Sequence, residues 1–184
     1  MNVIKTEIPD LIIFEPAVFG DDRGYFLETY NADRYKEAGI SENFVQDNLS
    51  FSRKGILRGL HYQTPMEQGK LVQVIEGEVY DVAVDIRVGS PTFGAWQSVV
   101  LSGLNKRQFY VPPGFAHGFV VTSETALFSY KCTDFYNPAG ERSIAWNDPE
   151  LGIDWPVTDP LVSEKDQRAV LLKDLQKQEL PSYE

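Results

Sequence analysis

The sequence predicts an all-β protein, either a sandwich or a barrel, and three observations lead to this prediction. Short stretches rich in β-branched and aromatic residues recur along most of the chain. Turns that contain glycine and proline separate these stretches, and helical periodicity is almost absent before the C-terminal part. Because no repeat, low-complexity tract or linker interrupts the pattern, we expect a single domain over residues 1–184.

The composition restricts the class of protein. Of the 184 residues, 42% are hydrophobic, which is enough for the core of one domain, and the net charge of −10 disfavours a nucleic-acid partner. A few local arginines can still bind an anionic small ligand. The single cysteine, Cys132, excludes an intrachain disulfide and fits a reducing compartment. The apolar run at the N-terminus is too short for a signal peptide or a membrane span, so we expect a soluble cytoplasmic protein without a membrane partner.

The first part of the chain predicts two or three short strands and one helix. The strands are expected at residues 3–7, 11–15 and 25–30, with Arg23 in the turn between the last two. A short helix is expected over residues 31–39, because Asn31 is a suitable N-cap and Gly39 is suitable just after the last turn.

The middle of the chain predicts further strands, and the tail changes character. The strands are expected at residues 44–52, 56–63, 70–76, 78–87, 95–102, 107–111, 117–121 and 125–136. Residues 147–160 are rich in turn formers, and residues 163–175 predict a short helix or turn that packs back on the barrel.

The two central strands have the clearest pattern of burial. Apolar residues alternate along residues 80–86, with Asp81 on the other face, which is the period of a half-buried strand. In the strand before it, Lys70 falls on the same face as Val72 and Val74. A lysine that heads an inward-facing apolar row is costly unless it has a partner or a task, so this row suggests a reactive pocket inside the barrel.

The chain contains two histidines, and each has a structural interpretation beside a functional one. His61 lies in a predicted strand and His117 follows a Pro-Pro-Gly turn. A lone histidine is more often a hydrogen-bonded structural residue, although a tuned imidazole is the usual acid–base group near neutral pH. Two widely separated histidines disfavour a transition-metal site, because such sites usually need three or more ligands, often in tight pairs.

Other polar residues also admit two interpretations. Asp166 fits the capping pattern that begins at Ser163, and by pattern alone capping is favoured. Arg23 and Arg58 suit phosphate oxygens, although exposed arginines are equally often only solvated. Tyr130 is typical of a core aromatic whose hydroxyl needs a partner if it is buried. The pattern alone therefore predicts a barrel with an acid–base pocket and leaves its substrate open.

The order of the longer motifs is more specific than any single motif. The chain contains, in this order, FGDDRGYFLETY, QDNLSFSRKGILRGLHYQ, QGKLVQVIEGEVYDVAVDIR, RQFYVPPGFAHGF, YKCTDFYNPAGERSIAWNDPELGIDWP and VSEKDQ. Together these motifs resemble the dTDP-4-dehydrorhamnose 3,5-epimerase family, from the first strands to about Arg168. The departures from the family pattern lie in the loop TPMEQ and in the C-terminal tail.

The resemblance implies an architecture. Its fold is a cupin-type jelly roll with a few short peripheral helices and a C-terminal tail that packs on the barrel. The family implies a homodimer in which N-terminal strands cross to the partner's sheet, and it implies no metal or organic cofactor.

The resemblance also implies roles for individual residues. His61 matches the general base and Asp166 the carboxylate paired with it, while Lys70 lies beside the sugar ketone and Tyr130 is the acid. The implied substrate contacts are Phe19, Arg23, Glu28, Gln46, Asp47, Asn48, Arg58, His117, Tyr136, Glu141 and Lys165.

The implied reaction explains these residue types. It is the epimerisation at C3 and C5 of dTDP-4-dehydro-6-deoxy-D-glucose to dTDP-4-dehydro-L-rhamnose, in dTDP-L-rhamnose biosynthesis. The C4 ketone acidifies both carbons, a base removes a proton, and an acid on the opposite ring face returns one. Arginines hold the diphosphate, and Tyr136 and Phe19 stack on the thymine. The alternatives are an epimerase of one centre only and a non-catalytic barrel that binds nucleotide sugars.

Two implied roles conflict with simple local geometry. Strict alternation puts Arg58 and His61 on opposite strand faces, whereas the resemblance brings both to the substrate. A bulge or bend at Gly59 would reconcile the two; otherwise Arg58 acts from the rim or across the dimer. Asp166 can serve as both cap residue and partner of His61 if its side chain orients the histidine while its backbone begins the helix.

Overall fold

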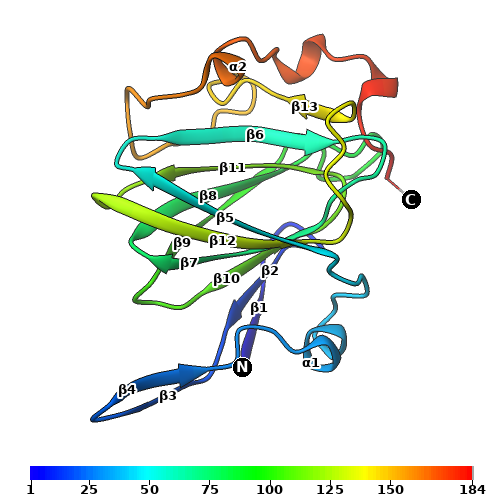
Figure 1. Ribbon diagram of the computed structural model, residues 1–184. Helices are drawn as coiled ribbons and strands as arrows, with labels where there is room; N and C mark the ends of the chain where they lie inside the picture. The colour runs from blue at the N-terminus through cyan, green and yellow to red at the C-terminus, as the bar shows by residue number, and fades with distance from the viewer. Residues whose placement is uncertain (184) are drawn as a thin grey trace.

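The computed structural model describes residues 1–183 and consists mainly of two antiparallel sheets that face each other (Figure 1). The six-stranded sheet contains, in spatial order, β1 (Asn2–Lys5), β2 (Ile12–Glu15), β10 (Gln108–Val111), β7 (Lys70–Glu76), β12 (Thr125–Cys132) and β5 (Gln46–Arg53). The five-stranded sheet contains β13 (Glu141–Ser143), β6 (Leu57–Gln63), β11 (Phe115–Val121), β8 (Glu78–Asp85) and β9 (Trp96–Ser102). Most spatial neighbours are not consecutive in the chain, as in a jelly roll, and the all-β prediction is confirmed.

Side chains between the two sheets form the main core. Val72, Val74 and Phe128 point inward from the six-stranded sheet and meet Phe119 and Val121 of β11. The rings of Phe119 and Phe128 stack with their centroids 4.2 Å apart. Burial of each such side chain contributes about 1.5–3 kcal/mol to the free energy of unfolding. The predicted inward face of β7 is therefore confirmed.

A second core lies on the other side of the five-stranded sheet, and it corrects the prediction for β8. Val82 and Val84 are fully buried there, against Leu151 and Leu172 of the C-terminal segment. Asp81, on the opposite face, is also fully buried and faces the barrel interior. The strand is thus buried on both faces rather than half-buried, because the C-terminal segment covers the face that alternation alone would leave open.

A third cluster covers the outer face of the six-stranded sheet. The helix α1 (Ala32–Glu37) begins after Asn31, whose side chain accepts a hydrogen bond from the Arg34 amide, as the predicted N-cap requires. Its buried Tyr35 packs on Phe14, with ring centroids 4.8 Å apart.

The N-terminal region differs from the prediction. Residues 18–27 form a separate hairpin of β3 (Val18–Asp21) and β4 (Gly24–Leu27), which extends away from the barrel (Figure 1). Phe19 and Phe26 on this hairpin are 65% and 70% exposed. The sequence predicted only a strand at 25–30 and missed β3, because its short segment VFGD has little alternation.

The C-terminal segment follows the outer face of the five-stranded sheet as turns and short helices. The helix α2 (Glu164–Gln167) is followed by two 3₁₀ turns, η1 (Leu172–Asp174) and η2 (Lys177–Glu179), within the stretch predicted as a short helix or turn. The Trp96 indole donates to the Leu151 carbonyl at 3.0 Å, and the Tyr62 hydroxyl donates to the Glu179 carbonyl at 3.0 Å. These bonds attach the segment to the sheet, as predicted.

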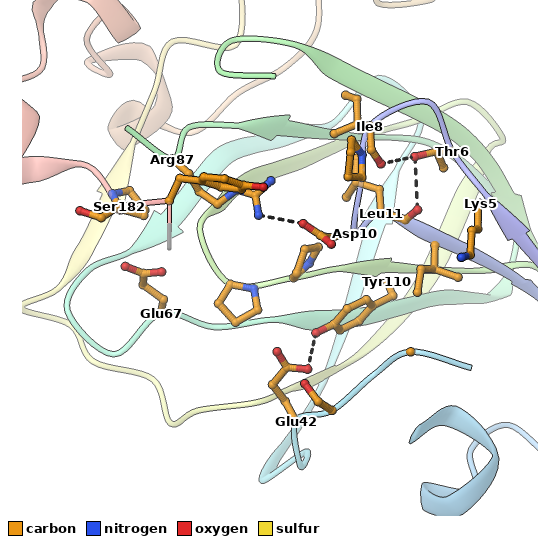
Figure 2. A pocket seen from close by; sticks show the side chains of 18 of the residues that line it. Lys5, Thr6, Ile8, Asp10, Leu11, Glu42, Glu67, Arg87, Tyr110 and Ser182 are labelled. Atoms are coloured by element: carbon orange, nitrogen blue, oxygen red, sulfur yellow. Dashed lines mark hydrogen bonds and ion pairs between the residues drawn. The ribbon is translucent and has the colours of Figure 1, made fainter. Parts of the chain in front are cut away.

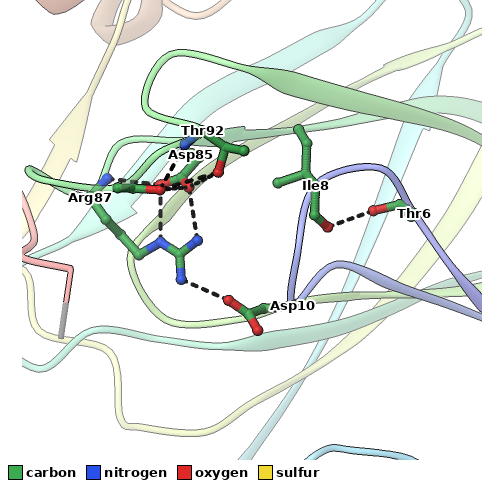
Figure 3. A network of polar contacts seen from close by, with 7 residues as sticks. Thr6, Ile8, Asp10, Asp85, Arg87 and Thr92 are labelled. Carbon is green, nitrogen blue, oxygen red and sulfur yellow. Dashed lines mark hydrogen bonds and ion pairs between the residues drawn. The ribbon is translucent and has the colours of Figure 1, made fainter.

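A polar network fixes the chain just beyond the end of β8. Arg87 donates to both carboxylate oxygens of Asp85, at 3.0 and 2.8 Å, and to Asp10 at 3.0 Å (Figure 3). Its guanidinium also lies 4.4 Å from the ring centre of Phe115 and 4.9 Å from that of Tyr183. The pKa of Asp85 is low, because these bonds outweigh the effect of its burial. The arginine therefore joins the β1–β2 turn, β8 and the end of the described chain.

Candidate active site

One histidine–carboxylate pair is assembled from distant parts of the chain. His61 on β6 and Asp166 on α2 are 105 residues apart, and His61 Nε2 lies 2.6 Å from Asp166 Oδ1. The side chain of His61 is 30% exposed and that of Asp166 only 3%. With Nε2 donating to the carboxylate, Nδ1 carries the lone pair and has no hydrogen-bond partner within residues 1–183.

Asp166 serves helix capping and histidine pairing through different atoms. Its backbone amide donates to the N-cap hydroxyl of Ser163 at 3.1 Å, while its carboxylate contacts His61. Burial would raise the pKa of Asp166, but the hydrogen bond and charge of His61 outweigh it and hold the pKa below its usual value. The backbone amide of Gly59 and the hydroxyl of Ser163 lower it further. The two interpretations of Asp166 are therefore compatible.

An irregularity in β6 brings Arg58 and His61 to the same face. His61 pairs with His117, but Arg58 pairs with Phe119, so two residues of β6, Gly59 and Leu60, oppose the single Gly118 of β11. The backbones approach closely here: a Cβ on Gly59 would lie 2.6 Å from the Cα of Gly118, and Gly59 has a φ of +133°. The bulge predicted at Gly59 is confirmed.

A second histidine–carboxylate pair lies deeper in the interior. His117 Nε2 is 2.9 and 3.0 Å from the two carboxylate oxygens of Asp81, on the neighbouring strand β8. The side chains are 8% and 0% exposed. His117 is thus a strand residue, as the strand expected at 117–121 predicted, and its partner is a buried carboxylate on the neighbouring strand.

The six-stranded sheet contributes the opposite wall. Cross-strand pairing aligns Lys70 with Cys132 and Gln46, and the next row aligns Tyr130 with Asn48. Side chains in one row share a face, so all of these point into the interior.

Lys70 is desolvated inside the barrel. Burial lowers its pKa, and the nearby Cys132, Asp81 and Glu141 oppose this only in part. Asp81 belongs to β8 and Glu141 to β13. Their effect on the pKa of Lys70 reflects how close this lysine of the six-stranded sheet lies to the five-stranded sheet.

Tyr130 also reaches across the interior. Burial raises the pKa of its hydroxyl, Cys132 adds to this rise, and Arg58 of β6 opposes it. Its ring packs on Phe128 with centroids 5.8 Å apart. The tyrosine and the histidine base candidate thus belong to different sheets and both face the interior between them.

A connected group of polar side chains borders the site. Glu141 accepts from Lys165 at 2.7 Å and from the Tyr136 hydroxyl at 3.0 Å. The pKa of Glu141 is low, because these two bonds outweigh its burial. Gln46 accepts from the Tyr136 amide at 3.0 Å and donates to Asn48 at 3.1 Å. The rim therefore links an exposed aromatic ring to the inner wall.

Four predicted site residues do not meet the others inside this chain. The side chain of Asp47 alternates to the outer face of β5 and binds Lys131 at 2.9 Å. Phe19 and Arg23 belong to the extended hairpin, where the Arg23 side chain binds Asp21 and is 89% exposed. Glu28 follows the hairpin and pairs with Arg34 at 2.8 Å.

Sequence reasoning missed three residues that border the site. Asp81 was assigned only to the polar face of a strand, Cys132 was given no role in the site, and Ser143 belongs to a strand that was not predicted. Asp81 interrupts the apolar residues of β8 and His117 those of β11, so a carboxylate and an imidazole in two otherwise apolar strands were a usable signal. A three-residue edge strand has no such signal.

A separate hollow lies elsewhere on the molecule and contains none of the predicted site residues. It has a volume of about 1030 Å³, and Figure 2 shows Asp10, Glu42, Arg87 and Tyr110 among its lining. Arg87 binds Asp10, and Tyr110 donates to Glu42 at 2.8 Å. Its polar groups are thus largely paired with one another.

Among the described residues there is neither a metal-binding group of side chains nor a membrane-spanning helix. No group of three or more His, Cys, Asp or Glu side chains among residues 1–183 is placed to hold a metal ion. No helix among these residues is long and apolar enough to cross a membrane.

Comparisons with known proteins agree on one family. The family model for dTDP-4-dehydrorhamnose 3,5-epimerase matches residues 5–174. The dTDP-4-dehydrorhamnose 3,5-epimerase of Pseudomonas aeruginosa is 59% identical over 176 residues, which is 95% of this chain and 97% of the relative. A dTDP-4-dehydrorhamnose 3-epimerase of Streptomyces niveus is 43% identical, over 85% of this chain and 77% of the relative. The crystal structure of a 3,5-epimerase from Legionella pneumophila in complex with dTDP-4-keto-L-rhamnose is 57% identical, with a TM-score of 0.97 over 100% of this chain and 98% of that chain.

Proposed function

The chain belongs to the dTDP-4-dehydrorhamnose 3,5-epimerase family, and we propose that the residues on its two facing sheets carry out that family's reaction. The enzyme is an isomerase that epimerises C3 and C5 of dTDP-4-dehydro-6-deoxy-D-glucose to form dTDP-4-dehydro-L-rhamnose, in dTDP-L-rhamnose biosynthesis. The observation that carries the residue assignments is the His61–Asp166 pair on one wall, opposite Tyr130 and Lys70 on the other.

His61 is the general base. Its Nε2 is held by Asp166, so Nδ1 is free to take a proton from a carbon next to the ketone. Asp166 keeps this tautomer and stabilises the imidazolium that forms, as the carboxylate of a hydrolase triad does. The partial exposure of His61 leaves room for a substrate to approach.

Lys70 stabilises the enolate oxygen. Proton removal next to the ketone places negative charge on the C4 oxygen, and a desolvated ammonium group interacts strongly with such a charge. Burial lowers the pKa of Lys70, because the charged ammonium group loses its contact with water. A negative C4 oxygen beside it restores that lost stabilisation.

Tyr130 is the acid on the opposite ring face. Burial raises the pKa of its hydroxyl, so the phenol keeps its proton at neutral pH and can donate it. Inversion at a carbon requires the proton to leave from one face and return on the other. Base and acid on opposite walls meet that requirement, and the chemistry uses only side chains of the protein.

The polar rim binds the rest of the substrate. Arg58 and His117 carry donors toward the diphosphate, and Tyr136 stacks on the thymine. Gln46, Asn48, Glu141 and Lys165 bond with one another around Tyr136, which prepares the ring for stacking. The contact at Asp47 is made by its backbone, because its side chain binds Lys131 on the outer face.

The remaining contacts are completed in a homodimer. Phe19, Arg23 and Glu28 lie on or next to the extended hairpin, away from His61 of their own chain. The hairpin exposes Val18, Tyr25 and Phe26 to 46%, 58% and 70%, which is unfavourable for a free hairpin in water. The N-terminal strands therefore pack against a second copy and carry Phe19 and Arg23 to the partner's site. Within their own chain these strands belong to the same single domain as the barrel. A cytoplasmic location fits the single reduced and buried Cys132.

The experiment that tests this function is proton NMR of dTDP-4-dehydro-6-deoxy-D-glucose with the purified protein in deuterated water. Deuterium entering at both C3 and C5 is expected, because each epimerisation passes through an enolate. Label at C3 alone would establish the single-centre alternative, for which the Streptomyces niveus relative is the precedent. A bound ligand that acquires no label would overturn the enzyme assignment in favour of a nucleotide-sugar sensor.

A further inference from the structure

Ser143 is a buried hydroxyl without a partner next to the proposed base. Two buried side-chain oxygens or nitrogens lack a hydrogen-bond partner among the described residues, the Oγ atoms of Ser143 and Ser50. A buried, unpaired hydroxyl is costly in a native protein and calls for an explanation. Ser143 has the more informative position, because it is aligned with the proposed base.

The strand register places Ser143 beside His61. Ser143 of β13 pairs with His61 of β6, which in turn pairs with His117 of β11. Leu60 and Ile144 exchange both backbone hydrogen bonds, at 3.1 and 2.9 Å, so the following pair of His61 and Ser143 is not hydrogen-bonded. Side chains approach most closely in such pairs, with Cβ atoms about 4.5–5.5 Å apart.

The alternation of β13 directs Ser143 toward the site and not toward the outer core. Ile144 is fully buried and packs with Leu60 and Leu172 on the outer side of the sheet. Ser143 therefore faces the interior, on the same side as Glu141, two residues earlier. Glu141 lies near enough to His61 for the imidazole to help lower the pKa of the glutamate.

We propose that the Ser143 hydroxyl hydrogen-bonds to the sugar ring of the substrate, on the face from which His61 removes a proton. No protein group in residues 1–183 bonds to Ser143 Oγ, which is closed to solvent as placed. A rotation about the Cα–Cβ bond turns the hydroxyl toward the substrate that enters the site. The part of the substrate next to the base is the sugar that loses the proton, and not the nucleotide. A ring hydroxyl suits a serine, because each group can both donate and accept. This makes Ser143 a residue that positions the ring, and it rests on the proposed function.

The test compares variants of the full-length protein in two measurements. In Ser143→Ala, kcat/KM for dTDP-4-dehydro-6-deoxy-D-glucose should fall about three- to tenfold, the worth of one neutral hydrogen bond. The dissociation constant for dTDP, which lacks the sugar, should stay within about twofold of the wild-type value. An unchanged kcat/KM would overturn the proposal, and so would a loss of dTDP affinity by the same factor, which would indicate a general defect of the site.

A matched pair of variants separates the hydroxyl from its volume. Ser143→Thr and Ser143→Val differ only by a hydroxyl in place of a methyl group, and both side chains suit a strand. The threonine variant should exceed the valine variant in kcat/KM by about three- to tenfold, and equal values would overturn the proposal. The wild-type protein is assayed in parallel: absence of deuterium exchange there would refute the proposed function itself, whereas an active wild type with equal variants would refute only the role of Ser143.

Discussion

The two histidine–aspartate pairs of the barrel have the same chemistry in different surroundings. In the first pair, His61 and Asp166 meet at 2.6 Å, and the histidine side chain is 30% exposed. In the second pair, His117 and Asp81 meet at 2.9 Å on adjacent strands, with side chains 8% and 0% exposed. The pairs are neighbours, because His61 and His117 are directly opposite each other on β6 and β11.

The two histidines differ in their exposure to solvent, and this difference suits them to different tasks. Proton transfer needs an imidazole with a free nitrogen that a substrate can reach, and His61 meets both conditions. A largely buried imidazole held by a buried carboxylate is better suited to keep a fixed position, from which it can bind substrate, than to remove a proton. The predictions below test this division, beginning with the largest expected effect.

Removing the accessible imidazole should abolish turnover while leaving the fold intact. We expect His61→Ala to lower kcat by about 10³-fold or more, because the side chain is assigned to proton removal. Steady-state kinetics and thermal unfolding of the same preparation check both parts. The matched variant His117→Ala should instead raise KM and lower the free energy of unfolding by about 3 kcal/mol, because it leaves Asp81 buried without its partner. Near-normal activity of His61→Ala would remove the histidine from the mechanism.

Exchanging the two carboxylates for amides should have opposite consequences. Asp166→Asn should lower kcat by about 10²-fold, because an amide neither fixes the tautomer of His61 nor stabilises the imidazolium. Its free energy of unfolding should fall by only about 1 kcal/mol. Asp81→Asn should lower the free energy of unfolding by about 2–3 kcal/mol and kcat by less than tenfold. Similar losses of activity in both variants would contradict the division of tasks.

Replacing the proposed acid should affect proton exchange at C3 and the formation of epimerised product differently. In Tyr130→Phe we expect deuterium exchange at C3 to persist while epimerised product is lost by about 10²-fold, because the base on the other wall is untouched. The NMR assay in deuterated water measures exchange and product together. Unchanged product formation in this variant would show that Tyr130 does not donate the proton.

The first pair should also contribute stability that depends on pH. The pKa of Asp166 is lower in the folded protein than the value of about 3.9 expected in an unfolded chain. Its contribution is therefore fully present above about pH 4–5 and is lost as the pH falls through the folded-state pKa, at about 1.4 kcal/mol for each unit of lowering. The difference in unfolding free energy between wild type and Asp166→Asn, measured by denaturant titration, should shrink on going from pH 6 to pH 3. A difference that does not change with pH would assign the effect of the variant to packing.

Much of the site could be predicted, and the misses share a cause. The long motifs brought His61, Lys70, Tyr130 and Asp166 into consideration, and an isolated strand glycine predicted the bulge that turns Arg58 inward. Ser143 escaped notice because its strand has only three residues, too few for alternation to be visible. The sequence could not show that the Asp47 side chain binds Lys131 on the outer face, because this depends on how β5 pairs with β12.

By itself, the sequence determined the strand periods, the turns, the N-cap at Asn31 and the family, since these are local or carried by long continuous motifs. The inward face of β7 could be predicted, but which face of β8 lies inside depended on the tertiary structure. Alternation along β8 separates Asp81 from Val82, but it does not say that the C-terminal segment covers Val82 while Asp81 faces the barrel interior. The meeting of His61 with Asp166 is likewise a matter of long-range packing, because nothing local to β6 specifies a partner 105 residues away.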